Sequence, residues 1–220
     1  MKLDASKLLR LAATGGASLT FAQAVHASTV LTGTGLGNNA DVPAGHGSNL
    51  IGSPNITVAW SPIGSGGWQA YSDGGWTNPS ALDETGTGLY QMDDATEGNT
   101  FTIVLSPDAG FDALLTSIDF NVYNGGGAFN IDWLVTGSLS GTLGSGSYVA
   151  PTDQNSTLSF GSLAGSGSEV LTLDLTIGAG SGTGSYLAAD NLAFDQIPEP
   201  CSVALGALGL GALAMRRRRK

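Results

Sequence analysis

The chain has 220 residues, 34 of them glycine, and its eight lysine and arginine residues lie only at the two ends: three within the first ten residues and five at positions 216–220. All but two of its 18 acidic residues, Asp4 and Glu199, lie between Ser28 and Ile197, so that segment has a formal charge of −16. With no Lys, Arg or Cys and with His46 alone, the segment cannot neutralise phosphates or build a thiol, lysine or multi-histidine site, which excludes nucleic-acid binding and leaves only carboxylate chemistry for catalysis.

The first predicted element is a signal peptide at residues 1–27. Three basic residues precede a stretch of apolar and small residues from Leu11 to Val25. The small residue Ala27 then suits cleavage by signal peptidase between Ala27 and Ser28. We therefore predict an N-terminal signal helix that is removed on export, and a mature protein that begins at Ser28.

Residues 28–196 show the pattern of β-strands separated by polar turns. Alternation of apolar and polar residues is clearest at 169–177, where four aliphatic side chains share one face. The pattern recurs at 116–124 and 128–136, which a glycine-rich turn joins, so these two strands are expected to pair as an antiparallel hairpin. Further strands are predicted at 55–60, 87–92, 99–105, 157–160 and 191–196.

The fold class follows from these strands. No long stretch shows the 3.6-residue period of an amphipathic helix, and the many glycines disfavour helices on entropic grounds. We predict an all-β protein: one antiparallel jelly-roll-type β-sandwich over 28–196, with an N-terminal signal helix and a C-terminal transmembrane helix. The segment Asp190-Asn191-Leu192-Ala193-Phe194 resembles the closing strand of jelly rolls of the carbohydrate-binding-module kind.

Four aromatic residues lie close together in a glycine-rich segment: Trp60, Trp68, Tyr71 and Trp76. Glycine-flanked rings in a loop can stack on sugar rings, which makes these four residues candidates for ligand binding. Large aromatic side chains also pack inside sandwich cores, and the sequence leaves both interpretations open.

Acidic residues cluster between the predicted strands 87–92 and 99–105, where Asp93, Asp94 and Glu97 occur. The resemblance to carbohydrate-binding modules implies that Asp190 would complete a structural Ca²⁺ site with acids of this kind, since carboxylate oxygens are hard ligands. No Asp-x-Asp-x-Asp-Gly loop is present, and solvated carboxylates also cap turns, so both roles remain open. A glycosidase that uses two carboxylates of the domain is a further alternative, although nothing in the sequence selects a pair.

The chain ends with three elements in a fixed order. These are Pro198-Glu199-Pro200, a span of apolar and small residues over 201–215, and a stop-transfer cluster of Arg216, Arg217, Arg218 and Arg219. Fifteen helical residues reach roughly 22 Å, short of a hydrocarbon core of roughly 30 Å. The cations should stay in the cytoplasm, so the chain before Pro198 lies on the outer side of the membrane.

Over residues 197–220, this order resembles the PEP-CTERM sorting signal of bacterial proteins that are processed by exosortase. The resemblance implies that Pro198, Glu199 and Pro200 are recognised by exosortase, an integral membrane cysteine peptidase, during transfer to the cell surface or exopolysaccharide matrix. A tail anchor that is never cut is the alternative.

Together these features predict an exported, non-catalytic, acidic structural protein of the cell surface or extracellular matrix, which passes through an inner-membrane-anchored precursor. Signal peptidase and exosortase are its expected processing enzymes, and extracellular polysaccharide is its expected partner. A carbohydrate-binding module protein that uses exposed tryptophans is the alternative.

Overall fold

The computed structural model describes residues 29–33, 35–37, 39–71, 89–123, 127–152, 154–182 and 186–199. These residues form twelve strands and contain no helix, which confirms the predicted all-β class. The predicted signal helix and C-terminal transmembrane helix lie outside the described residues. Within the described ranges, no helix is long and apolar enough to cross a membrane.

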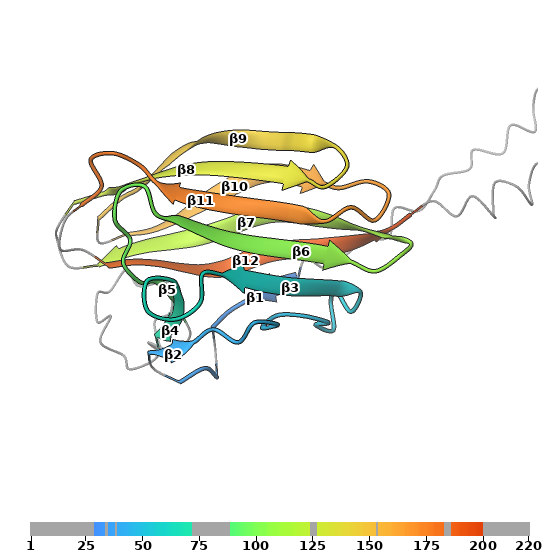
Figure 1. Ribbon diagram of the computed structural model, residues 1–220, viewed down its shortest axis with the longest axis horizontal. Helices are drawn as coiled ribbons and strands as arrows, with labels where there is room; N and C mark the ends of the chain where they lie inside the picture. Colours follow the sequence, from blue (N-terminus) through green and yellow to red (C-terminus); the bar gives the residue numbers. More distant parts are fainter. Residues whose placement is uncertain are drawn as a thin grey trace, which may run out of the picture.

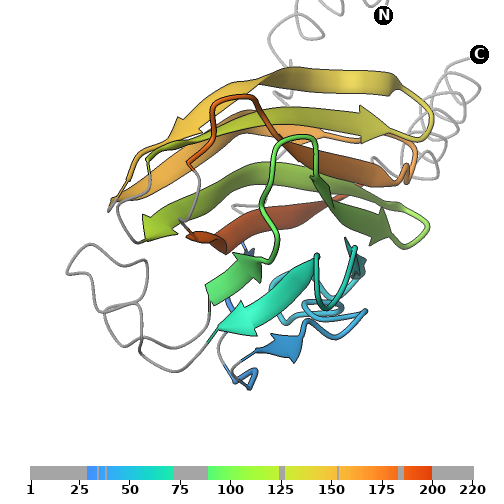
Figure 2. The same cartoon turned by 60° about the vertical axis from the view of Figure 1, so that its left-hand side comes forward.

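In chain order the strands are β1 (Thr29–Leu31), β2 (Ala40–Asp41), β3 (Ile56–Ser61), β4 (Trp68–Tyr71), β5 (Leu89–Met92), β6 (Thr100–Pro107), β7 (Phe111–Tyr123), β8 (Phe129–Gly137), β9 (Gly141–Ala150), β10 (Asn155–Ala164), β11 (Leu171–Ile177) and β12 (Tyr186–Pro198). They form two sheets that pack face to face, as Figures 1 and 2 show. The first sheet has the order β10-β7-β12-β5-β4-β2, with β1 also paired to β12, and the second has the order β3-β6-β11-β8-β9. Every pairing between these strands is antiparallel, as expected of a sandwich.

The hydrophobic core lies between the two sheets. In β11, Leu171, Leu173, Leu175 and Ile177 point inward and are buried, and the residues between them face outward. The other sheet contributes residues such as Phe120 to the same cluster. Burial of one such side chain stabilises the fold by about 1.5–3 kcal/mol, so this core is the main source of stability.

The predicted hairpin between 116–124 and 128–136 is wrong. The corresponding strands are β7, which pairs with β10 and β12 in the first sheet, and β8, which pairs with β11 and β9 in the second. Each of these strands has one strongly apolar face. Placing the strands in opposite sheets lets both faces meet in the core, so the chain crosses from one sheet to the other between them.

Most of the predicted strands correspond to observed ones, but β1, β2, β4 and β9 were not predicted. Strand β9 is an edge strand, and most of its residues are exposed or half-buried on both faces. It therefore lacks the apolar alternation on which the prediction rests. Strand β12 continues past residue 196 to Pro198, which pairs with Phe111.

Glu169 joins two turns at one end of the sandwich. Its carboxylate accepts hydrogen bonds from the backbone N–H groups of Leu139 (3.0 Å), Ser140 (2.9 Å) and Ser166 (3.0 Å), and from the hydroxyl of Ser140 (2.8 Å). The residue is only 2% exposed. Burial on its own raises the pKa of Glu169, but the four hydrogen bonds outweigh burial and hold the pKa below its usual range.

Replacement of Glu169 by glutamine should lower the free energy of unfolding by about 2–3 kcal/mol, because an amide cannot accept all the hydrogen bonds that the carboxylate accepts. Urea unfolding at neutral pH measures this loss. The matched control is Glu97→Gln, which changes an exposed glutamate and should leave stability nearly unchanged.

The pH dependence of stability shows whether Glu169→Gln loses hydrogen bonds to an ionised carboxylate or only packs less well. Because the pKa of Glu169 is lowered on folding, the unfolded chain binds the proton more readily at this site. The contribution of the ionised Glu169 to stability is therefore fully present above pH 4.5, the ordinary pKa of a glutamate. It is lost as the pH falls through the folded-state pKa. The melting temperature of the wild type should thus fall more steeply on acidification than that of Glu169→Gln, and parallel curves would contradict the assignment.

Candidate functional site

The structure places two of the candidate ligand-binding tryptophans in the core. Trp60 and Trp68 are 4% and 0% exposed, and their ring centroids lie 5.1 Å apart. The indole N–H of Trp68 donates to the carbonyl oxygen of Thr102 (3.3 Å). Neither ring offers a face to a sugar, so the ligand-binding expectation is wrong for these two residues and the packing interpretation holds. The side chain of Tyr71 and the whole of Trp76 lie outside the described residues.

His46 belongs to the same aromatic cluster. Its Nε2 atom lies 2.9 Å from the hydroxyl oxygen of Tyr90, and the indole N–H of Trp60 donates to its carbonyl oxygen (2.9 Å). Burial and, to a smaller extent, the negative charge of Asp190 raise the pKa of Tyr90, so the phenol keeps its proton. These contacts tie the glycine-rich loop around His46 to the core.

The structure does not bring together the four proposed calcium ligands, which are Asp93, Asp94, Glu97 and Asp190. Asp190 lies in β12, where it is paired with Asp119 of β7, and it is buried. In the part of the chain that the structure describes, no group of three or more His, Cys, Asp or Glu residues is placed to hold a metal ion. The expected calcium set is therefore not supported by this geometry.

Two of these acids instead fix turns, which agrees with the turn-capping interpretation. Asp93 accepts a hydrogen bond from the backbone N–H of Gly66 (3.0 Å) through Oδ2. The Asn99 side-chain amide donates to the carbonyl oxygen of Asp94 (2.7 Å) and to its Oδ2 atom (3.3 Å). Asp94 has a φ of 55°, a left-handed conformation that Asp tolerates better than most residues.

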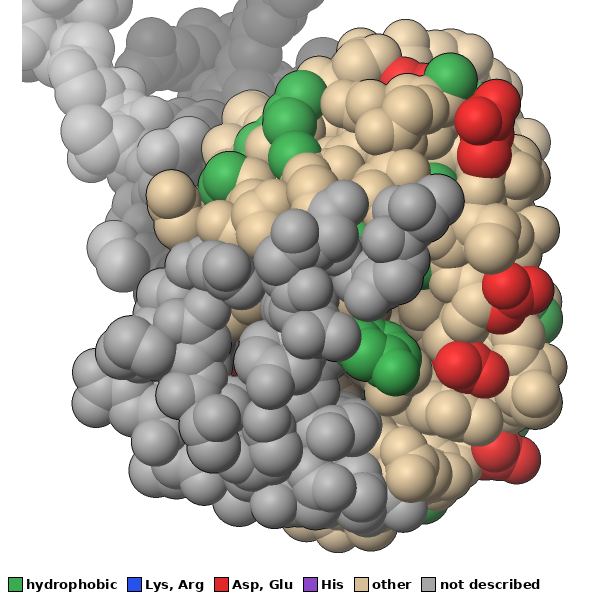
Figure 3. Space-filling model, turned by 90° about the vertical axis from the view of Figure 1, so that its left-hand side faces the viewer, with side chains coloured by type: hydrophobic (Ala, Val, Ile, Leu, Met, Phe, Trp, Pro, Cys, Tyr) green, Lys and Arg blue, Asp and Glu red, His purple; other side chains and the backbone are tan. Residues whose placement is uncertain are grey.

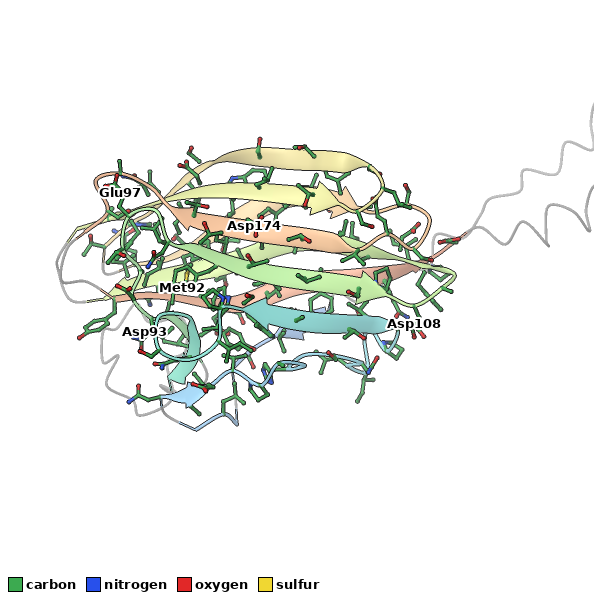
Figure 4. All side chains as sticks on the ribbon, viewed as in Figure 1. Met92, Asp93, Glu97, Asp108 and Asp174 are labelled. Carbon is green, nitrogen blue, oxygen red and sulfur yellow. The ribbon has the colours of Figure 1, made fainter. Side chains whose placement is uncertain are left out.

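An open hollow of ≈ 400 Å³ lies next to this turn. Its lining comes from the end of β5 and the following turn, from Ser181 and Gly182, and from Tyr186 at the start of β12. Figure 4 places Met92, Asp93 and Glu97 at this end of the sandwich, and Asp108 at the opposite end. Figure 3 views the same end and shows acidic side chains along one side of it.

The hollow combines one aromatic ring with several hydrogen-bonding groups. Tyr186 is 50% exposed, so part of its ring faces solvent. Gln91, Thr96 and Ser181 contribute an amide and two hydroxyls to the lining, beside the carboxylates of the turn. The hydroxyl of Ser181 donates to the carbonyl oxygen of Gly178 (2.8 Å), which holds this wall in place. Such a surface can stack against a pyranose ring and hydrogen-bond to its hydroxyls.

Sequence reasoning missed this hollow. In the sequence, Tyr186 is marked only by its position directly after a Gly/Ser-rich loop. This is a much weaker signal than two glycine-flanked tryptophans. Its neighbours Gln91 and Ser181 come from segments about 90 residues apart along the chain, so only the fold brings them together.

Two of the strand acids, Asp119 and Asp132, lie in different sheets of the sandwich. Asp119 lies in β7 of the first sheet, where it accepts a hydrogen bond from the Thr157 hydroxyl (2.6 Å). Asp132 lies in β8 of the second sheet and is hydrogen-bonded to Ser147. The two acids belong to different layers, whereas a glycosidase needs two carboxylates about 5–9 Å apart at one site.

No protein-family model and no curated protein matches the sequence. Several solved structures match with low similarity. An arabinose-bound α-L-arabinofuranosidase (MgGH51) has a TM-score of 0.44 and 11% identity, and the match covers 78% of this chain and 26% of that one.

Two smaller proteins match over most of their own length. TmCBM61 in complex with β-1,4-galactotriose has a TM-score of 0.35 and 12% identity over 66% of this chain and 88% of that one. The N-terminal cellulose-binding domain of Cellulomonas fimi β-1,4-glucanase C has a TM-score of 0.33 and 22% identity over 61% of this chain and 91% of that one. Because all three TM-scores are below 0.5, the function of this chain has to be inferred from its own residues.

Replacement of Trp68 by alanine should destabilise the protein by about 3–5 kcal/mol, because it leaves a large cavity beside Trp60 and Phe101. Urea unfolding, followed by circular dichroism, measures the loss. The matched control is Tyr186→Ala, which truncates a half-exposed aromatic residue and should cost much less. Equal stability of the two variants would contradict the core position of Trp68.

Proposed function

We propose that this chain is an exported bacterial surface or matrix protein that binds neutral polysaccharide through the hollow beside Tyr186, and that its C-terminal segment is a PEP-CTERM-like sorting signal. The observation that carries the binding role is the half-exposed ring of Tyr186 at a hollow of ≈ 400 Å³. The role is non-catalytic, because it requires only stacking and hydrogen bonds.

The size of the hollow and its openness to solvent suit a polymer. Its volume lies at the lower end of the range for small-molecule sites, about 300–1,000 Å³, so it would hold one or two sugar units of a longer chain. The turn carrying Asp93 and Asp94 is tied to Gly66 and Asn99, so little ordering is needed on binding. Both features support recognition of a polysaccharide at a preformed site.

Charge selects among polysaccharides. The segment from Ser28 to Ile197 has no lysine or arginine, and Asp93, Asp94 and Glu97 line the hollow. A uronic-acid polymer would bring negative charge against these carboxylates without any cation to offset it. The expected ligand class is therefore a neutral glycan.

The sorting role is supported by the sequence at the end of the chain. A Pro-Glu-Pro motif, an apolar span too short for a comfortable membrane crossing and four consecutive arginines follow one another there. An uncut tail anchor would need the span and the charges but would give no role to Pro198-Glu199-Pro200. Processing by an exosortase, after removal of residues 1–27 by signal peptidase, accounts for all of them.

Replacement of Tyr186 by alanine should weaken binding to a neutral β-glucan by about ten-fold, because the stacking face is removed. Affinity gel electrophoresis of the mature protein measures this, with polygalacturonate as the acidic comparison polymer. The matched control is Leu139→Ala, which removes a 73% exposed apolar side chain far from the hollow. Unchanged retention of Tyr186→Ala, or stronger retention on polygalacturonate, would contradict the proposal.

Intact mass spectrometry of protein recovered from the producing cells should show loss of Met1 to Ala27 and of the tail near Pro200, because both terminal segments act as processing signals. The cell surface and the medium are sampled separately. A product that keeps Arg216 to Lys220 would mean a plain tail anchor and would overturn the exosortase assignment.

A further inference from the structure

The first two residues of the Pro-Glu-Pro motif are part of the folded sandwich. Pro198 is the last residue of β12 and is paired with Phe111 at the start of β7. The backbone N–H of Glu199 donates to the carbonyl oxygen of Gly110 (2.9 Å). Figure 1 shows β12 ending at the edge of the sandwich, at the end opposite the turn with Met92 and Asp93 that Figure 4 labels.

Ser168 holds the side chain of Glu199. Its hydroxyl donates to Oε1 of Glu199 (2.7 Å) and accepts a hydrogen bond from the backbone N–H of Gly110 (3.0 Å). Its own backbone N–H donates to Oδ1 of Asp112 (3.0 Å). One serine thus joins the turn before β7, the loop before β11 and the end of β12, three segments that meet only when the chain is folded.

No cationic side chain of the domain can take over the role of this serine. The carboxylates of Asp112 and Glu199 both accept a hydrogen bond from Ser168, and no lysine or arginine occurs between Ser28 and Ile197 to form an ion pair with Glu199. The hydroxyl of Ser168 is therefore the group that keeps the Glu199 side chain on the sandwich. Without it, the Glu199 carboxylate loses this hydrogen bond, and water can take the place of the hydroxyl.

We propose that Ser168 is a positioning residue that latches Glu199 to the folded domain, and that this latch has to open before a membrane peptidase can bind the motif. The inference rests on the proposed sorting function. A peptidase that recognises Glu199 competes with Ser168 for its carboxylate and with Gly110 for its backbone N–H. The folded domain therefore slows its own processing, and an incompletely folded domain exposes the motif.

The test is Ser168→Gly in the full chain, produced in a host with an active exosortase. Ser168 has a φ of 56°, a conformation that glycine adopts without strain. The substitution therefore removes the hydroxyl and does not strain the backbone. The matched control is Ser162→Gly, the same exchange at an exposed serine with a φ of 65° in β10. Pulse-chase labelling followed by mass spectrometry gives the half-life of the uncut precursor.

The precursor half-life should fall about five-fold in Ser168→Gly, because one hydrogen bond to a charged group is lost, and should stay unchanged in Ser162→Gly. Equal half-lives for Ser168→Gly and the wild type would overturn the latch while leaving the sorting proposal intact. A wild type that is never cut would overturn the sorting proposal instead.

Amide hydrogen exchange of the full chain in detergent then tests the latch without any peptidase. The Glu199 amide should be protected in the wild type and in Ser162→Gly, and should exchange several-fold faster in Ser168→Gly. Exchange of the wild-type Glu199 amide at the rate of an unstructured peptide would overturn the latch.

Discussion

The fold has to hold sixteen carboxylates in a segment without a single lysine or arginine to pair with them. Several of the described acids accept hydrogen bonds from hydroxyl and amide donors instead. Glu169 shows the strongest case, with four such bonds. On the strands, Asp174 accepts from the hydroxyl of Thr102 (2.6 Å), and Asp119 accepts from the side-chain amide of Asn191 (3.0 Å). The abundant Ser, Thr and Gly residues thus supply hydroxyl and backbone N–H donors to the carboxylates, in addition to forming turns.

How much of the fold the sequence could predict depends on the range of the interactions involved. Strand β11 was predicted almost to its ends, because its alternation of apolar and polar residues is a local consequence of burying one face. Residue 169 was expected to begin that strand, but Glu169 instead binds the adjacent turn at Ser166 and the turn at Leu139, which lies 30 residues away in the sequence. The hairpin was mispredicted because its pairing also depends on contacts that only the fold decides. A glycine-rich connection permits a tight turn and does not require one.

The candidate site was predictable to a smaller degree. Glycine-flanked tryptophans suggested exposed binding faces, but Trp68 occupies an inward position of a short strand, and the apolar area of its ring makes burial the stable outcome. The acids of the turn after β5 were found correctly as a cluster. Their grouping with Tyr186 and Ser181 was not, because those residues join them only through the pairing of distant strands.

Strand β12 links the two ends of the sandwich at which the proposed binding and sorting sites lie. It begins with Tyr186 at the hollow and ends with Pro198 at the Ser168 latch, and thirteen extended residues span about 40 Å. If the segment after Pro198 enters the membrane, the hollow lies at the end of the sandwich that points away from the bilayer, where a polymer of the surrounding matrix can reach it. Release of the tail would then leave the hollow unchanged, because the strand that carries Tyr186 is fixed along its length by β7. The proposed binding and sorting roles thus depend on opposite ends of one strand.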